Sequence, residues 1–175
     1  MKKLCSLATI LILLSGQTLF AAEISDFFGA YTGSAKVEDD GGTVARDMGV
    51  RIIQTDAGFQ VTWTSITHKQ DGRLKEKKYT IGFVPSAREN IYASAMKTNV
   101  FGKSEPLDPL KGDPYVWSRL SGDTLTLYSL LIDEEGGYEV QEYDRTLADG
   151  GLELEYRRIR NSTPLTTINA FLARN

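Results

Sequence analysis

Residues 58–68, Gly-Phe-Gln-Val-Thr-Trp-Thr-Ser-Ile-Thr-His, alternate apolar and polar side chains. Phe59, Val61 and Trp63 share one face, and the residues between them are Gln and Thr. A period of two is typical of a β-strand with one face on a core and the other in water. The segment therefore predicts a half-buried strand.

The same alternation returns in the C-terminal half, and short glycine turns such as Asp71-Gly72 and Asp149-Gly150-Gly151 separate the segments. These turns are too short for a crossover helix, so neighbouring strands should pair antiparallel. The expected strands lie near residues 27–37, 44–54, 58–68, 73–84, 90–96, 115–120, 123–133, 137–147 and 150–160.

Two segments break the pattern. Residues 98–114 contain Pro106, Pro109 and Pro114, which remove ladder donors and predict a surface loop. The tail predicts a short C-terminal helix, with Thr163 as its N-cap and Pro164 at its first position.

We expect an all-β fold, an antiparallel up-and-down meander that closes into an eight- to nine-stranded barrel, because closure hides every strand edge. A transmembrane barrel needs an apolar outward face in mid-span. Lys75 and Lys77, and Glu153 and Glu155, place charges in the middle of strands. The sequence thus favours a water-soluble barrel.

Residues 1–22 resemble a secretory signal peptide: Lys2 and Lys3 precede an apolar run that is shorter than a membrane span. Cleavage there leaves 23–175 as a single β-barrel domain, periplasmic or secreted from a bacterium. Cys5, the only cysteine, falls within the signal. Its removal excludes disulfides, thiolate metal sites and a cysteine nucleophile from the mature chain.

The chain has 20 basic and 23 acidic residues, and loss of Lys2 and Lys3 moves its formal charge from -3 to -5. This balance argues against binding to nucleic acid or to anionic lipid. After removal of the signal, nothing predicts a membrane-spanning segment. His68 is the only histidine, and the acidic turns lack the ligand spacing of a calcium loop, so no metal or other cofactor is predicted.

The first predicted strand contains Gly29-Ala30-Tyr31, which is similar to the Gly-x-Trp pattern of the lipocalin or calycin superfamily. The resemblance implies a cup that holds a small, largely apolar molecule. It also implies that an arginine near the end of the last strand, here Arg157 or Arg158, packs across Tyr31.

Two arginines share the alternation of apolar neighbours. Arg46 does so with Met48, Val50 and Ile52, and Arg158 does so with Tyr156. If they point inward, each needs a carboxylate, an aromatic face or a ligand anion, because an unpaired buried guanidinium is costly. The predicted ligand-binding residues are Tyr31, Arg46, Trp63, Tyr128, Tyr156 and Arg158.

We therefore expect a non-catalytic barrel that binds a small hydrophobic or amphipathic ligand. One alternative is an envelope interaction protein with a filled core that recognises a protein or glycan through residues 98–114. A weaker one is a hydrolase or isomerase, whose acids would come from Asp47, Asp113, Glu142 and Asp144. No residue set in the sequence forms a catalytic group.

Overall fold

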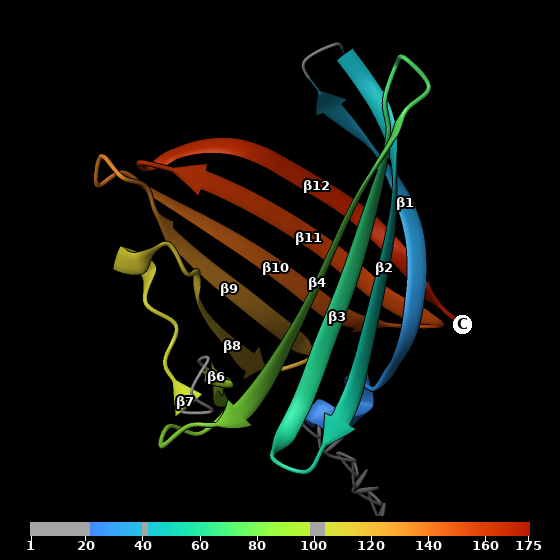
Figure 1. Cartoon of the computed structure of the whole chain (residues 1–175). Helices are drawn as coiled ribbons and strands as arrows, with labels where there is room; N and C mark the ends of the chain where they lie inside the picture. Colours follow the sequence, from blue (N-terminus) through green and yellow to red (C-terminus); the bar gives the residue numbers. More distant parts are fainter. Residues whose placement is uncertain (1–21, 40–41, 99–103) are drawn as a thin grey trace, which may run out of the picture.

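The computed structural model describes residues 22–39, 42–98 and 104–175, which form a closed antiparallel barrel of ten strands (Figure 1). The barrel strands are β1 (Gly29–Asp39), β2 (Gly42–Thr55), β3 (Gly58–His68), β4 (Leu74–Pro85), β5 (Ile91–Ser94), β8 (Tyr115–Ser121), β9 (Thr124–Ile132), β10 (Tyr138–Ala148), β11 (Gly151–Arg160) and β12 (Thr163–Arg174). Their order round the ring is β1-β12-β11-β10-β9-β8-β5-β4-β3-β2.

The described part of the chain also contains a two-stranded sheet, formed by β6 (Lys97–Thr98) and β7 (Ser104–Glu105), and two 3-10 helices, η1 (Ile24–Phe27) and η2 (Pro109–Lys111). The segment predicted as a loop at 98–114 holds β7 and η2, and its residues 99–103 lie outside the described residues. No described helix is both long and apolar enough to cross a membrane. The predicted signal lies outside the described residues up to position 21.

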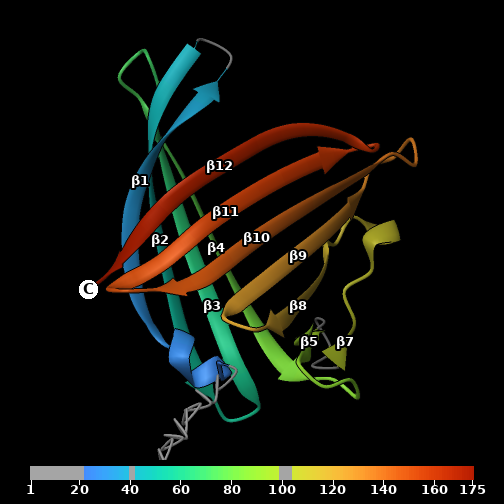
Figure 2. The same cartoon turned by 180° about the vertical axis from the view of Figure 1, so that it is seen from behind.

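The all-β class and the closed antiparallel meander are confirmed, and all nine predicted strands are present. The expected count of eight to nine was too low, because the tail forms a tenth strand, β12, instead of a helix. β12 pairs with β11 from Arg160↔Thr163 to Gly151↔Ala173, and it closes the ring on β1, as Figure 2 shows. β-branched Thr166, Thr167 and Ile168 favour that pairing over a helix.

Alternate residues of every strand point into the barrel, and at one end they form a dry core. Its buried apolar side chains are Phe27, Tyr31, Val50, Ile52, Phe59, Val61, Phe83, Val116, Leu120, Leu125, Leu127, Leu152, Leu154 and Leu172. Burying each large apolar side chain contributes about 1.5–3 kcal/mol, so this end supplies most of the stability of the barrel.

Helix η1 covers the dry end of the barrel. Phe27 in η1 is fully buried, and the Tyr31 hydroxyl donates a hydrogen bond to its carbonyl oxygen at 3.0 Å. The Arg174 guanidinium lies over the Tyr31 ring, 5.6 Å from its centroid, and donates to the carbonyl oxygen of Phe28. These contacts fasten the first and last strands to the helix.

The cation beside Tyr31 is therefore Arg174, and the prediction that Arg157 or Arg158 packs there was wrong. The unpredicted strand β12 explains the error, since it places Arg174 directly opposite Tyr31 in the ladder. Arg157 instead contacts carboxylates on the outer face, and Arg158 lies near the opposite end of β11.

The barrel wall is weakest around β5. β4 pairs with β5 only at Phe83–Pro85, and β5 pairs with β8 only at Ile91–Ala93. Among the described residues, positions 74–81 of β4 have no strand partner on that side. In Figure 1 this part of β4 runs away from β8 and β9.

Replacing Arg174 by Met should lower the free energy of unfolding by about 1–2 kcal/mol, because it removes a cation–π contact and a hydrogen bond to a backbone carbonyl. Urea unfolding followed by tryptophan fluorescence measures the change. Arg51→Met, at an exposed position of β2, is the matched control and should be nearly neutral. Equal effects of the two substitutions would contradict the assigned role of Arg174.

Candidate functional site

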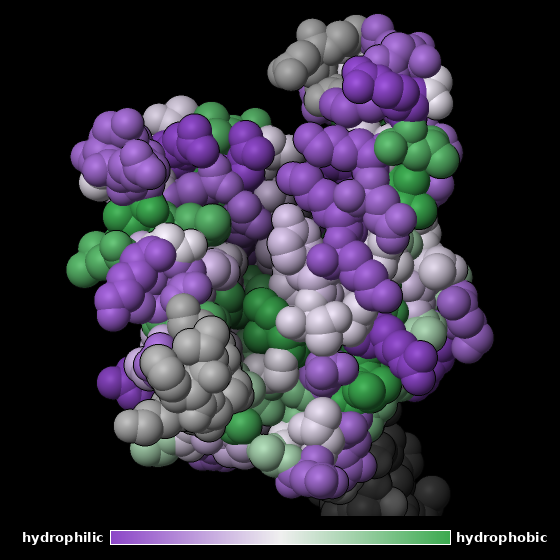
Figure 3. Space-filling view, viewed as in Figure 1, coloured by the Kyte–Doolittle hydropathy of each residue, from purple (hydrophilic) through white to green (hydrophobic). Residues whose placement is uncertain are grey.

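A cavity of about 540 Å³ lies inside the barrel above the dry core. Its lining comes from β1, β2, β3, β4, β10, β11 and β12, and Lys77 and Tyr79 bring it to the unpaired edge of β4. Figure 3 shows apolar surface in the recess between the two halves of the wall. A volume of this size suits one small organic molecule.

Arg145 of β10 lines the inner part of this cavity and is only 2% exposed. Its ladder partners are Leu125 and Leu154, both core residues, so no carboxylate faces it from the neighbouring strands. Its Nε and Nη1 atoms are buried without a hydrogen-bond partner among the described residues. The guanidinium lies 5.5 Å from the centroid of the Tyr143 ring, and Asp144 attracts it without an ion-pair contact.

The burial of Arg145 carries a free-energy cost. Burial lowers the pKa of the guanidinium to about 10, so it still carries its charge at neutral pH. A change from the ordinary 12.5 corresponds to about 3 kcal/mol against the charged form. Because the folded-state pKa of this base is lowered, the penalty is present in full below pH 10. It disappears only as the pH rises toward the unfolded-state pKa.

The cavity as a whole is positively charged, although the chain carries a net charge of -3. Among the described residues that line it, the charged ones are Arg46, Lys77, Arg145, Arg158 and Glu38. Four cations thus face one carboxylate, and the Glu38 carboxylate already accepts a hydrogen bond from Thr43 at 2.7 Å. The interior therefore attracts anions.

The outer part of the cavity holds two incompletely paired arginines. Arg46 donates from Nε to the Thr67 hydroxyl at 3.1 Å and makes no ion pair with a described carboxylate. Arg158 reaches Glu139 at only 3.8 Å, and its Nε is buried without a hydrogen-bond partner. Glu139 is engaged by Arg160 at 3.1 Å and by the side-chain amide of Gln141 at 2.7 Å.

Four aromatic rings run across the cavity. Tyr79, 48% exposed at the edge of β4, stacks on Trp63 with centroids 5.3 Å apart. Trp63 lies 5.6 Å from Tyr143, which lies 4.7 Å from Tyr156. Burial raises the pKa of the Tyr143 hydroxyl, which donates to the Gln141 side-chain oxygen at 3.0 Å. Uncharged aromatic rings thus lie between Arg145 at the inner end of the cavity and Arg46 and Arg158 at the outer end.

The structure brings four of the six predicted ligand-binding residues to this cavity: Arg46, Trp63, Tyr156 and Arg158. Tyr31 belongs to the closed end, where it packs under η1. Tyr128 lies on the outer face and stacks on Trp117 with centroids 4.8 Å apart, because Leu125 and Leu127 take the inward positions of β9.

Sequence reasoning missed Arg145 and Tyr143 as binding residues, and it placed Lys77 on the outward face, whereas Lys77 lines the cavity. Tyr143, Arg145 and Leu147 share one face of β10, which is the signal that Arg145 points inward. The signal is weak because the outward residues of this strand are as polar as the inward ones. The pairing of β10 with β9 and β11 determines which of its faces points inward.

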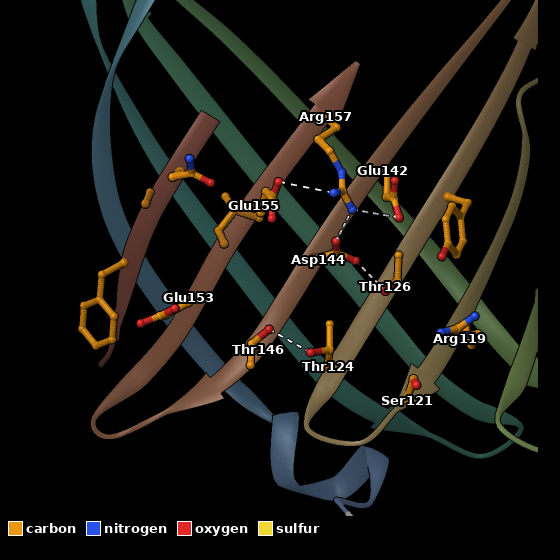
Figure 4. A pocket seen from close by; sticks show the side chains of 15 residues that line it. Arg119, Ser121, Thr124, Thr126, Glu142, Asp144, Thr146, Glu153, Glu155 and Arg157 are labelled. Atoms are coloured by element: carbon orange, nitrogen blue, oxygen red, sulfur yellow. Dashed lines mark hydrogen bonds and ion pairs between the residues drawn. The ribbon is translucent and has the colours of Figure 1, made fainter. Parts of the chain in front are cut away.

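A second, shallower groove of about 770 Å³ lies on the outer face of β8–β12 (Figure 4). Its centre is Arg157, which contacts Asp144 at 2.6 Å, Glu142 at 3.1 Å and Glu155 at 3.4 Å. Thr126 donates to the other oxygen of Asp144 at 2.6 Å. The carboxylates of this groove are therefore already paired with side chains of the protein.

The other acidic candidates do not join that cluster. Asp47 contacts His68 at 2.6 Å on the outer face, and Asp113 lies after η2. Within the described ranges, no group of three or more His, Cys, Asp and Glu side chains is arranged to hold a metal ion. Comparisons with family models and with curated proteins found no match.

Replacing Arg145 by Met should stabilise protein that was purified unfolded and refolded without ligand, by about 1–3 kcal/mol, because an apolar side chain removes an unpaired buried charge. Chemical unfolding measures the change. Arg119→Met, exposed on β8, is the matched control and should be nearly neutral. A loss of stability in the Arg145 variant would show that the guanidinium is satisfied without a ligand.

Proposed function

We propose that this protein is an exported, non-catalytic, water-soluble barrel that binds a small amphipathic molecule through an acidic group. The unpartnered Arg145 guanidinium carries the proposal. A buried cation without a carboxylate costs stability, and a bound anion offsets that cost with charge-assisted hydrogen bonds. Such costs are commonly retained where a residue serves function.

Two further features support a ligand over a filled interior. The cavity joins apolar side chains of the core, among them Val50 and Leu172, to the aromatic rings above them. Lys77 and Tyr79 line the cavity and are exposed to solvent on the stretch of β4 that lacks a partner strand, so a molecule can approach the interior from that side. Both features suit an amphipathic molecule whose acidic end enters first.

The proposed compartment follows from the expected signal, and the proposed solubility from the outer surface. Outward positions of β10 and β11 carry charged residues, among them Asp144, Glu153 and Arg157, in the middle of the strands. A lipid-facing wall would be destabilised by such charges. The resemblance to lipocalins agrees with this proposal.

Biphenyl-4-carboxylate should bind one to one and at least tenfold more tightly than its uncharged amide, as measured by isothermal titration calorimetry on the folded protein. Arg145→Gln should weaken the acid about tenfold or more and leave the amide unchanged, because a hydrogen bond to a charged group contributes about 1.5–3 kcal/mol. The control Arg119→Gln alters a cation on the outer face. If neither compound binds, or both bind equally, the anion-binding function is refuted.

A further inference from the structure

We propose that the natural ligand carries two acidic groups at opposite ends of an aromatic or conjugated body. Arg145 binds the inner group, and Arg46 with Arg158 binds the outer one. This inference rests on the proposed function, because it defines the class of ligand for the same cavity.

The two cationic ends are separated along the strands. Arg145 stands opposite Leu154 in the β10–β11 ladder, and Arg158 follows Leu154 by four residues on the same face of β11. At about 3.3 Å per residue, the two levels are about 13 Å apart along the strand. One small acidic group cannot contact both levels, whereas two groups on a rigid body can.

The outer end has spare donors for a second anion. Glu139 neutralises Arg158 only in part, because the two arginines share its single charge and Arg160 lies closer, at 3.1 Å against 3.8 Å. Among the described residues, the side chain of Arg46 donates its hydrogen bond to a neutral hydroxyl, that of Thr67. A ligand with a single acidic head at Arg145 would leave these outer donors to water.

The region between the two ends is built for flat rings. Tyr143 lies two residues above Arg145 on β10, directly opposite Tyr156 of β11. Trp63 approaches the same Tyr143 ring from β3. Tyr79, Trp63, Tyr143 and Tyr156 contact one another in turn and form one continuous aromatic surface along the cavity. Such a surface favours a planar body that lies on it, since offset and edge-on ring contacts add to the gain from apolar burial. A flexible alkyl chain would not use this geometry.

The test compares biphenyl-4,4'-dicarboxylate with its monoamide, which has the same shape and one charge fewer. Calorimetry is carried out with the folded protein at physiological salt. The diacid should bind about tenfold more tightly than the monoamide. Arg158→Gln and Arg46→Gln should each reduce that ratio toward one while the affinity for the monoamide stays unchanged. Arg51→Gln, on the outer surface, is the control and should keep the ratio.

The variants also separate the two ends of the cavity. Arg145→Gln should weaken the diacid and the monoamide by similar factors, because both place an acid at the inner site. Circular dichroism and the unfolding midpoint of each variant establish that it is folded.

The outcomes distinguish the two proposals. If the monoamide binds in an Arg145-dependent way and the diacid binds no better, the two-acid inference is overturned and the proposed function stands. If neither compound binds, the proposed function fails, and the inference fails with it. A tenfold preference that survives both outer substitutions would also overturn the inference, because it would place the second acid elsewhere.

Discussion

A positive charge enclosed without a counter-charge is the constraint on which the interior of this barrel depends. Arg145 points inward between Leu125 and Leu154, and its sequence neighbour Asp144 points outward. The outward carboxylate is held by Arg157 and Thr126 and does not reach the inner guanidinium. The alternation of β10 therefore places Arg145 and Asp144 on opposite faces of the wall, so that Asp144 attracts the guanidinium without forming an ion-pair contact with it.

Apolar packing elsewhere in the fold offsets the free-energy cost of burying Arg145. The dry end buries a continuous apolar cluster, and Tyr31, Phe27 and Arg174 fasten the chain ends around it. Gly33 allows the closure, because a Cβ there would stand 2.2 Å from the Phe171 carbonyl oxygen. Most of the apolar core thus lies at one end of the barrel. The other end has a smaller buried cluster, Val37, Val44 and Ile168, beside the polar and aromatic side chains around the cavity.

The sequence predicted the strands well because period-two alternation and glycine turns are local signals. The helix predicted for the tail was wrong because Thr163-Pro164 can start a helix as readily as a strand. The pairing with β11 decides between the two. Arg46, Trp63, Tyr156 and Arg158 were found as cavity residues by extending clear alternations. Arg145 was missed because both faces of β10 are polar, and Tyr31 and Tyr128 were misplaced because an aromatic residue suits core, cavity and surface alike.

The most direct test observes the Arg145 side chain itself. In a nitrogen-15 NMR titration of the folded protein with biphenyl-4-carboxylate, the Nε–H resonance assigned through Arg145→Lys should shift and saturate at one equivalent. The amide of the same compound should leave it in place. An Arg145 resonance that does not respond to the acid would contradict the account, because the guanidinium would then have no role in anion binding.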